Sequence, residues 1–294
     1  MMRVTPEVLR QVKGIELRTR TLVNSLFGGG YRSVFRGQGI EAAEVRGYQH
    51  GDDFRAIDWN VSARMGHPFV KLFHEERELT LLLLVDHSRS QWFGHPATKG
   101  GLAVEVAAVL ALAAARYDDR VGALLFADKV EHVIPPAKGR LHALRVIRDL
   151  LAYRVRGRGT NLGEALRYAT RLLRQRAIVV VLSDFRATGW EEPLGRLARR
   201  HEVVAVTVDD PREVNLPDAG WVEFEDAENG RRVLLDAGHA PTRLEVRIAA
   251  ERFLLERARK LNVAGVDRVT LRTDAPYAAS LRQAFAARAR RLRR

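Results

Sequence analysis

Short apolar runs without polar alternation recur along the chain, and a polar loop or turn follows each of them. The clearest run covers residues 79–85, where six of seven positions are apolar. Further runs cover residues 121–126, 178–182 and 203–208, and a last one covers residues 266–271. Continuous apolar runs of this length are typical of strands that are buried on both faces of a parallel sheet. The pattern therefore predicts a sheet core built from these segments.

Between these runs, apolar residues recur at helical spacing, three and four positions apart. The expected helices cover residues 6–27, 102–115, 141–151, 162–173, 243–261 and 277–291. Strands that alternate with helices predict an α/β fold, a doubly wound and mostly parallel sheet of the Rossmann type. Residues 130–134 are expected as an edge strand that Pro135-Pro136 ends, and Asn229-Gly230 predicts a β-hairpin.

The chain is expected to divide at about residue 78. Residues 1–78 contain a helix and then a charged, glycine-rich segment, whereas residues 79–294 contain the doubly wound domain with a hairpin inserted near 221–236. In the N-terminal part, opposite charges interleave around one turn, and arginine can bridge carboxylates bidentately. We expect a structural charge network that consists of Arg46, Arg55, Arg64, Asp52, Asp53 and Asp58. A catalytic acid pair is the alternative, but a carboxyl group bound to arginine is held ionised and makes a poor general acid.

Composition removes several classes of protein from consideration. The chain has no cysteine, which excludes a disulfide framework and a thiolate metal site. No apolar run approaches about 18 residues, so we expect no membrane span. Because the first residues lack the apolar core of a signal peptide, we expect a cytoplasmic protein. The formal charge of +13 arises mostly from arginine, and the arginine-rich residues 282–294 leave nucleic-acid binding open as an alternative.

Oxygen-bearing side chains follow two of the apolar runs and lie in one further loop. Asp86, Ser88 and Ser90 come directly after the first run. Asp184 follows the third run, and Thr160 stands just ahead of a helix cap. The carboxyl ends of parallel strands form the edge where ligands bind, so these side chains could surround one cation if the two strands are neighbours. Hard oxygen ligands suit Mg²⁺, whereas the structural alternative is an aspartate that ends a strand and a serine that caps the next helix.

The order of these residues, Asp-x-Ser-x-Ser followed by Thr and then Asp, resembles the metal-ion-dependent adhesion site of the von Willebrand factor A fold. The resemblance implies that Ser88, Ser90 and Thr160 ligate a Mg²⁺ or Mn²⁺ ion directly. It also implies that Asp86 and Asp184 act mainly through bound waters or hydrogen bonds. An acidic residue of a partner would fill the open coordination position.

Other motifs extend over roughly residues 5–240. They are Arg46-x-Tyr48, Gly51-Asp52-Asp53-x-Arg55-x-Ile57-Asp58-Trp59, Ala63-Arg64, Glu75-Glu76-Arg77-Glu78, Asp119-Arg120-Val121-Gly122, Gly159-Thr160-Asn161-Leu162, Ser183-Asp184-Phe185 and Asp210-Pro211-Arg212-Glu213. Together they resemble a bacterial family called domain of unknown function 58 (DUF58). Members of that family commonly accompany MoxR-type AAA+ ATPases, so the resemblance implies an adaptor or chaperone-like partner of such an ATPase.

We therefore expect a non-enzymatic, metal-dependent protein-interaction module that binds a MoxR-type ATPase or its client through an acidic residue. We do not expect nucleic acid as the partner. A Mg²⁺-dependent hydrolase acting on phosphate esters is one alternative, but no histidine is paired with these loops and hydroxyl ligands lower the cation's charge little. An arginine-rich nucleic-acid-binding protein is the other alternative, and it predicts a steep salt dependence.

Overall fold

The computed structural model describes residues 5–27, 44–72, 79–92, 97–155, 157–228 and 230–292. Three expected features lie outside these ranges: the glycine-rich stretch 28–43, the motif that begins at Glu75 as far as Glu78, and Asn229 of the hairpin turn. Within the described ranges, no helix combines the length and the apolar character that crossing a membrane requires.

Six strands form the central sheet in the order β10-β7-β6-β3-β4-β5. They are β3 (Thr80–Asp86), β4 (Arg120–Phe126), β5 (Val130–Ala137), β6 (Ile178–Ser183), β7 (Glu202–Asp209) and β10 (Asp267–Arg272). All neighbours pair in parallel except β4 and β5, which are antiparallel. The expected α/β fold, a doubly wound and mostly parallel sheet, is confirmed.

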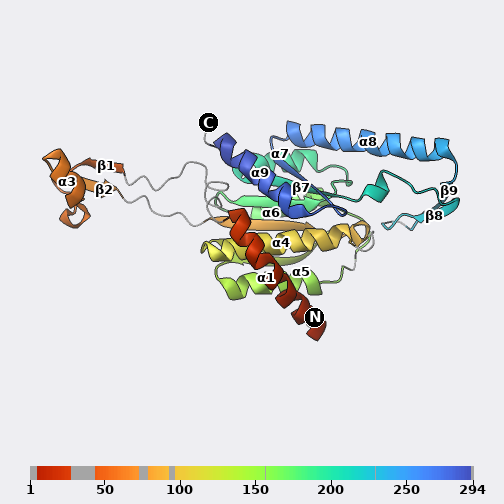
Figure 1. The fold of residues 1–294 in the computed structure, drawn as a ribbon, viewed down its shortest axis with the longest axis horizontal. Helices are drawn as coiled ribbons and strands as arrows, with labels where there is room; N and C mark the ends of the chain where they lie inside the picture. Colours follow the sequence, from red (N-terminus) through yellow and green to blue (C-terminus); the bar gives the residue numbers. More distant parts are fainter. Residues whose placement is uncertain are drawn as a thin grey trace.

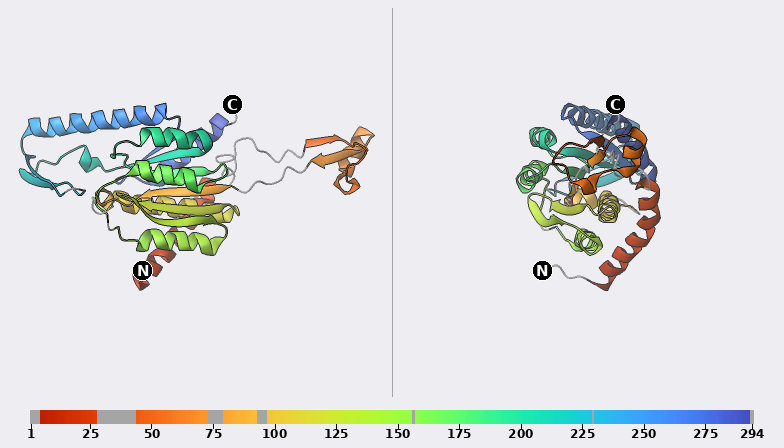
Figure 2. Two further views of the ribbon diagram at one scale, coloured as in Figure 1. Left: turned by 180° about the vertical axis from the view of Figure 1, so that it is seen from behind. Right: turned by 90° about the vertical axis from the view of Figure 1, so that its left-hand side faces the viewer.

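Helices cover both faces of this sheet, as Figures 1 and 2 show. One face carries α1 (Pro6–Phe27), α4 (Lys99–Arg116), α5 (Arg140–Ala152) and α9 (Tyr277–Leu292). The other face carries α6 (Leu162–Leu172), α7 (Glu191–Arg200) and α8 (Ala240–Val263). Along β3, Leu81 and Leu83 enter the first apolar core, whereas Leu82 and Leu84 enter the second. This double burial explains why the run has no polar alternation.

Helix α1 packs onto the sheet domain, although the expected boundary at residue 78 separated the two. Val8, Val12 and Ile15 belong to the same apolar core as α4 and α5. Thr19 is also buried, and its hydroxyl donates to the Ile15 carbonyl at 2.7 Å. The apolar stripe of a helix indicates that one face is buried but does not indicate which element covers that face. The expected N-terminal part therefore splits, because its helix belongs to the doubly wound core.

Residues 44–72 form a small unit that stands apart from the sheet in Figure 1. Its elements are β1 (Glu44–Gly47), η1 (Phe54–Ala56), α3 (Trp59–Met65) and β2 (Phe69–Leu72), with β1 and β2 antiparallel. Arg46 binds Asp52 bidentately, with N–O distances of 2.7 and 2.8 Å. This ion pair is the part of the expected charge network that forms as we described it.

The other expected members of that network make the following contacts. Asp53 caps η1 by accepting the Arg55 N–H, and Asp58 caps α3 by accepting two backbone N–H groups. The Arg55 guanidinium lies over the Phe54 ring, 5.7 Å from its centroid, and Arg64 is exposed in the last turn of α3. Aspartate suits both a cap and an ion pair, so interleaved charges in a sequence do not distinguish these roles.

Strand β5 continues through Pro135 and Pro136, where we had expected it to end. It is an edge strand, and its register against β4 shifts between Val121 and Ala123, opposite the two prolines. Edge strands and irregularities of this kind are the places where a sheet tolerates proline. Helix α7 was not expected, because only Pro193, Leu194 and Leu197 are buried along it. The expected hairpin is confirmed, with β8 (Trp221–Glu225) antiparallel to β9 (Arg232–Asp236).

Gly122 of β4 permits the close approach of the edge strand β5. A Cβ atom at this position would lie 2.7 Å from both Ile134 O and Pro136 N, which are backbone atoms. We expect Gly122→Ala to lower the free energy of unfolding by about 1–3 kcal/mol, as overpacking of a core does. Urea denaturation of the variant and the wild type measures this difference.

Gly195 in α7 provides the matched control, because no atom lies within 4 Å of a Cβ built there. Gly195→Ala should keep the free energy of unfolding or raise it by up to about 1 kcal/mol, since alanine is the better helix former. Equal stability of the two variants would contradict the tight contact at Gly122.

Candidate metal-ion site

The neighbouring strands β3 and β6 bring two buried carboxylates to one edge of the sheet. β3 ends at Asp86, and β6 ends at Ser183, directly before Asp184. The strands pair in parallel with Val85 opposite Leu182, so the first and third buried runs are neighbours, as the predicted site requires. Asp86 and Asp184 are both buried.

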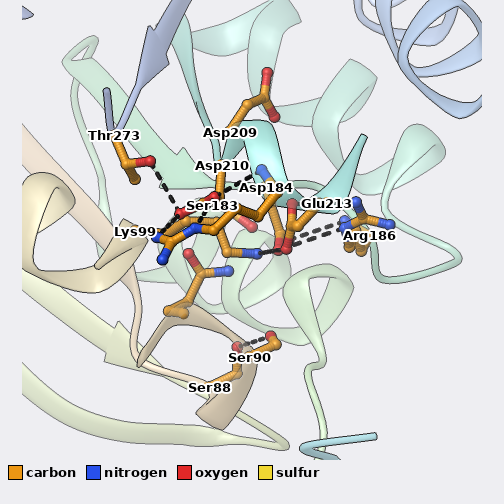
Figure 3. A network of polar contacts seen from close by, with 12 residues as sticks. Ser88, Ser90, Lys99, Ser183, Asp184, Arg186, Asp209, Asp210, Glu213 and Thr273 are labelled. Carbon is orange, nitrogen blue, oxygen red and sulfur yellow. Dashed lines mark hydrogen bonds and ion pairs between the residues drawn. The ribbon is translucent and has the colours of Figure 1, made fainter. Parts of the chain in front are cut away.

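The loop after β3 is folded around the Asp86 carboxylate. One carboxylate oxygen accepts the Ser88 N–H at 3.0 Å, and the other accepts the Ser183 hydroxyl at 2.6 Å. The second bond links the loop to the end of β6. In the short η2 helix (Arg89–Trp92), the Ser90 hydroxyl lies 3.1 Å from that of Ser88 (Figure 3). Two of the predicted ligands therefore lie side by side.

Thr160 lies in the loop before α6, where Asn161 caps the helix with its side chain. The Asn161 N–H donates to Ala127 O at 2.6 Å, which ties this loop to the end of β4. The Thr160 hydroxyl donates to Oε1 of Glu228, and the Ser90 hydroxyl donates to the same oxygen at 3.4 Å. One carboxylate thus connects Thr160 to the serine pair.

A buried lysine, which the sequence analysis missed, binds Asp184. The side chain of Lys99 is 0% exposed. Its Nζ donates to Asp184 Oδ2 and to Glu213 Oε1, each at 2.6 Å. The other Asp184 oxygen accepts the Arg186 N–H at 3.1 Å, and the Arg186 guanidinium donates to Glu213 at 3.1 Å (Figure 3). These four residues form a closed network of charges beside the predicted site.

Two features of the sequence point to Lys99 in retrospect. It is one of only six lysines in an arginine-rich chain. It also follows the Thr98 cap at the start of an almost wholly apolar helix, where a charge needs a buried partner. Glu213 belongs to a motif that we noted without a role, whereas no local pattern distinguishes Glu228 from the other acids of its hairpin.

The two aspartates differ in their protonation behaviour. Burial raises the pKa of Asp86 to about 7, and the negative charge of Asp184 adds to the rise. Burial acts in the same direction on Asp184, but the charge and hydrogen bond of Lys99 outweigh it and hold the pKa of Asp184 below its usual range. Because the ammonium of Lys99 is bound to Asp184 and Glu213, Asp86 is the group that a further positive charge would stabilise.

The donor atoms at this edge fit a hard divalent cation. They are the carboxylates of Asp86 and Asp184 and the hydroxyls of Ser88, Ser90 and Thr160, all of them oxygen. In the part of the chain that the structure describes, no group of three or more His, Cys, Asp or Glu side chains is placed to hold a metal ion. An ion here would therefore depend on the hydroxyls. Asp184, with both oxygens in hydrogen bonds, suits an indirect role.

A second set of ion pairs fixes the surrounding elements. Arg257 of α8 is buried and binds both carboxylate oxygens of Asp209, at 2.7 and 2.8 Å. The same guanidinium donates to the Asp184 carbonyl at 2.8 Å. Asp210 accepts the Thr273 hydroxyl at 2.9 Å (Figure 3). The ends of β7 and β10 and the helix α8 are thereby held at the same edge as the predicted ligands.

The chain matches known proteins over most of its length. Residues 44–253 match the family described as "Protein of unknown function DUF58". The uncharacterized protein Rv1480 of Mycobacterium tuberculosis (strain ATCC 25618 / H37Rv) is 33% identical over 291 residues, which cover 97% of this chain and 91% of that protein. The uncharacterized protein YeaD of Bacillus subtilis (strain 168) is 46% identical over 52 residues, 18% of this chain and 13% of YeaD.

Solved structures with a similar arrangement include BatB from Bacteroides thetaiotaomicron. It has a TM-score of 0.47 at 17% identity, and the match covers 72% of this chain and 99% of BatB. The SpRpn10 VWA domain has a TM-score of 0.37 at 13% identity, with 70% of this chain and 94% of that domain covered. The family match over residues 44–253 and the relative matched along nearly the whole chain agree with the motifs. This chain therefore belongs to the DUF58 family.

Proposed function

We propose that this chain is a non-enzymatic, metal-dependent protein-interaction module. Ser88, Ser90 and Thr160 would hold a Mg²⁺ or Mn²⁺ ion directly, and Asp86 and Asp184 would act through bound waters or hydrogen bonds. When bound, the ion supplies a divalent positive charge that attracts a carboxylate of a partner protein. The observation that supports the proposal is the pairing of β3 with β6, which brings Asp86 and the loop after β3 to the same sheet edge as Asp184.

The balance of charge at this edge supports a cation. Asp86 is buried, and its pKa is raised because burial and the charge of Asp184 both disfavour its ionised form. Lys99 supplies one positive charge, but it is shared between Asp184 and Glu213. A divalent ion next to Asp86 would favour the ionised carboxylate and would accept lone pairs from the serine hydroxyls.

The hydrogen bonds of the two aspartates favour binding over catalysis. A pKa of about 7 for Asp86 would suit a general base of a hydrolase acting on phosphate esters. Both oxygens of Asp86, however, already accept hydrogen bonds from the protein, and both oxygens of Asp184 do so as well. These contacts orient the carboxylates as parts of the scaffold. We therefore propose a binding role and expect no Mg²⁺-dependent phosphatase turnover.

The partner that we propose is a MoxR-type AAA+ ATPase or its client, bound through an acidic residue. This step is supported by the family, whose members commonly accompany such ATPases, and by the positive charge that a bound ion would present. It would place the module in the cytoplasm. Nucleic acid is a weaker candidate, because Arg288 of the arginine-rich tail is buried and pairs with Glu202 and Asp267.

Replacement of Asp86 tests the metal dependence. We expect Asp86→Ala to weaken Mg²⁺ binding by about 10–100-fold, because it removes a carboxylate that orients the ligands and balances the ion's charge. Isothermal titration calorimetry with Mg²⁺ measures this affinity, and circular dichroism shows whether the fold is kept. Association with the ATPase should then be Mg²⁺-dependent in the wild type and lost in the variant.

Asp274 offers the control for this experiment, since it is an exposed acid that pairs with Arg272 at 2.7 Å. Asp274→Ala should bind Mg²⁺ as the wild type does. If Asp86→Ala also bound Mg²⁺ and the ATPase with wild-type affinity, the site would not have the proposed role.

The buried ion pair of Lys99 should contribute strongly to stability. Lys99→Met leaves Asp184 without its ammonium partner in a buried place, and removal of one member of a buried pair costs about 3–5 kcal/mol. We expect a loss of that size in the free energy of unfolding, measured by urea denaturation in the presence of a chelator. Added Mg²⁺ should recover more stability in this variant than in the wild type.

Lys138 is the lysine for comparison, because its side chain is 32% exposed and that of its ion-pair partner Asp118 is 78% exposed. Lys138→Met should change the free energy of unfolding by no more than about 1 kcal/mol. Similar small losses for both lysine variants would show that the Lys99 network does not hold this edge together.

A further inference from the structure

The tip of the β8–β9 hairpin reaches the predicted metal ligands. Glu228 follows Thr160 by 68 residues and Ser90 by 138, yet its Oε1 atom accepts a hydrogen bond from each hydroxyl. The Glu228 N–H donates to Asp226 Oδ1 at 2.9 Å, which fixes the backbone of the tip. A carboxylate from a distant segment of the same chain therefore lies on two of the three hydroxyls that would hold the ion.

The position of the Glu228 carboxylate would allow it to ligate an ion that these hydroxyls hold. An ion held by hydroxyls and neutral waters carries most of its charge, and a carboxylate is the ligand that best completes such a coordination sphere. Glu228 presents a single oxygen to Ser90 and Thr160 together. When an ion occupies the space between these hydroxyls, that oxygen is already within reach of it. A partner's carboxylate would need the same coordination position on the ion.

The hairpin is anchored at its base and largely exposed along its strands. The Ala237 N–H donates to Gly220 O at 2.7 Å, and the Arg243 guanidinium donates to the carbonyls of Ala237 and Gly238 at 2.6 and 2.7 Å. Farther along, Leu234 is 61% exposed. A two-stranded ribbon with so little buried surface has low local stability, so its tip can leave the site while its base stays in place.

We propose that Glu228 is an intramolecular ligand of the metal ion, which closes the site until an acidic partner displaces it. This inference rests on the function proposed above and adds a regulatory step to it. In the closed state the Glu228 carboxylate balances part of the ion's charge. It also occupies the coordination position that a partner's carboxylate would take. Only a partner whose carboxylate competes with a tethered one gains access, so weak acidic ligands are excluded.

Mn²⁺ is the probe that tests direct ligation, because it binds where Mg²⁺ binds and reports on its own water ligands. The full chain is titrated with Mn²⁺ for the wild type, Glu228→Gln and Glu228→Ala. We expect Glu228→Ala to lose Mn²⁺ affinity on the order of tenfold. The Mn²⁺ affinity of Glu228→Gln should equal that of Glu228→Ala or lie between it and the wild type. The relaxation rate of water protons should show about one more water on the bound ion in Glu228→Ala.

Glu223→Gln is the control, since this acid lies on the same hairpin with an exposed side chain that pairs with Arg232. It should match the wild type in both measurements. Mn²⁺ binding with equal affinity and equal hydration in wild type, Glu228→Ala and the control would overturn the internal ligand but leave the metal site. A wild type that binds no Mn²⁺ would overturn both proposals.

Displacement is tested with an oligoglutamate peptide as the acidic probe, in saturating Mn²⁺. Fluorescence anisotropy should show that Glu228→Ala binds the labelled peptide several-fold more tightly than the wild type and the Glu223→Gln control, because no tethered carboxylate competes. Equal peptide affinity in all three proteins would contradict the closed state.

Discussion

The parallel pairing of β3 with β6 is the constraint on which the rest of this structure depends. It places two buried carboxylates, Asp86 and Asp184, at adjacent strand ends, and their burial makes their combined negative charge costly. The neighbouring elements are arranged to reduce that cost. Lys99 reaches in from α4, and Ser88 and Ser183 donate hydrogen bonds. The site is thus a consequence of how the sheet is ordered.

Two kinds of positive charge are suited to this edge of the sheet: one that is covalently part of the chain and one that can exchange with solvent. The ammonium of Lys99 is covalently part of the fold and satisfies Asp184 and Glu213. A divalent ion beside Asp86 would be exchangeable and would offer open coordination positions. In the proposed function, the fixed charge of Lys99 would maintain the scaffold, and an exchangeable ion would meet the partner. As an internal ligand, Glu228, which accepts a hydrogen bond from Thr160, would add a tethered carboxylate to the exchangeable ion.

Local pattern was sufficient for the features that depend on one segment. The apolar run of β3 has no alternation because both of its faces are buried, and the loops after β3 and β6 could be read directly from their oxygen-bearing residues. Contacts between distant segments could not be read in this way. The ion pair of Lys99 with Asp184 spans 85 residues, and α1 packs on helices that follow much later. The prolines of β5 lie in an edge strand, where its register against β4 shifts. Each depends on the tertiary arrangement and not on spacing.

The most direct test of the central claim is a crystal of the full chain soaked in Mn²⁺ and measured at a wavelength where manganese scatters anomalously. The account predicts one strong anomalous peak at the carboxyl ends of β3 and β6, about 2.1 Å from the hydroxyl oxygens of Ser88, Ser90 and Thr160. A structure with fully occupied manganese elsewhere, and with none at these hydroxyls, would contradict it.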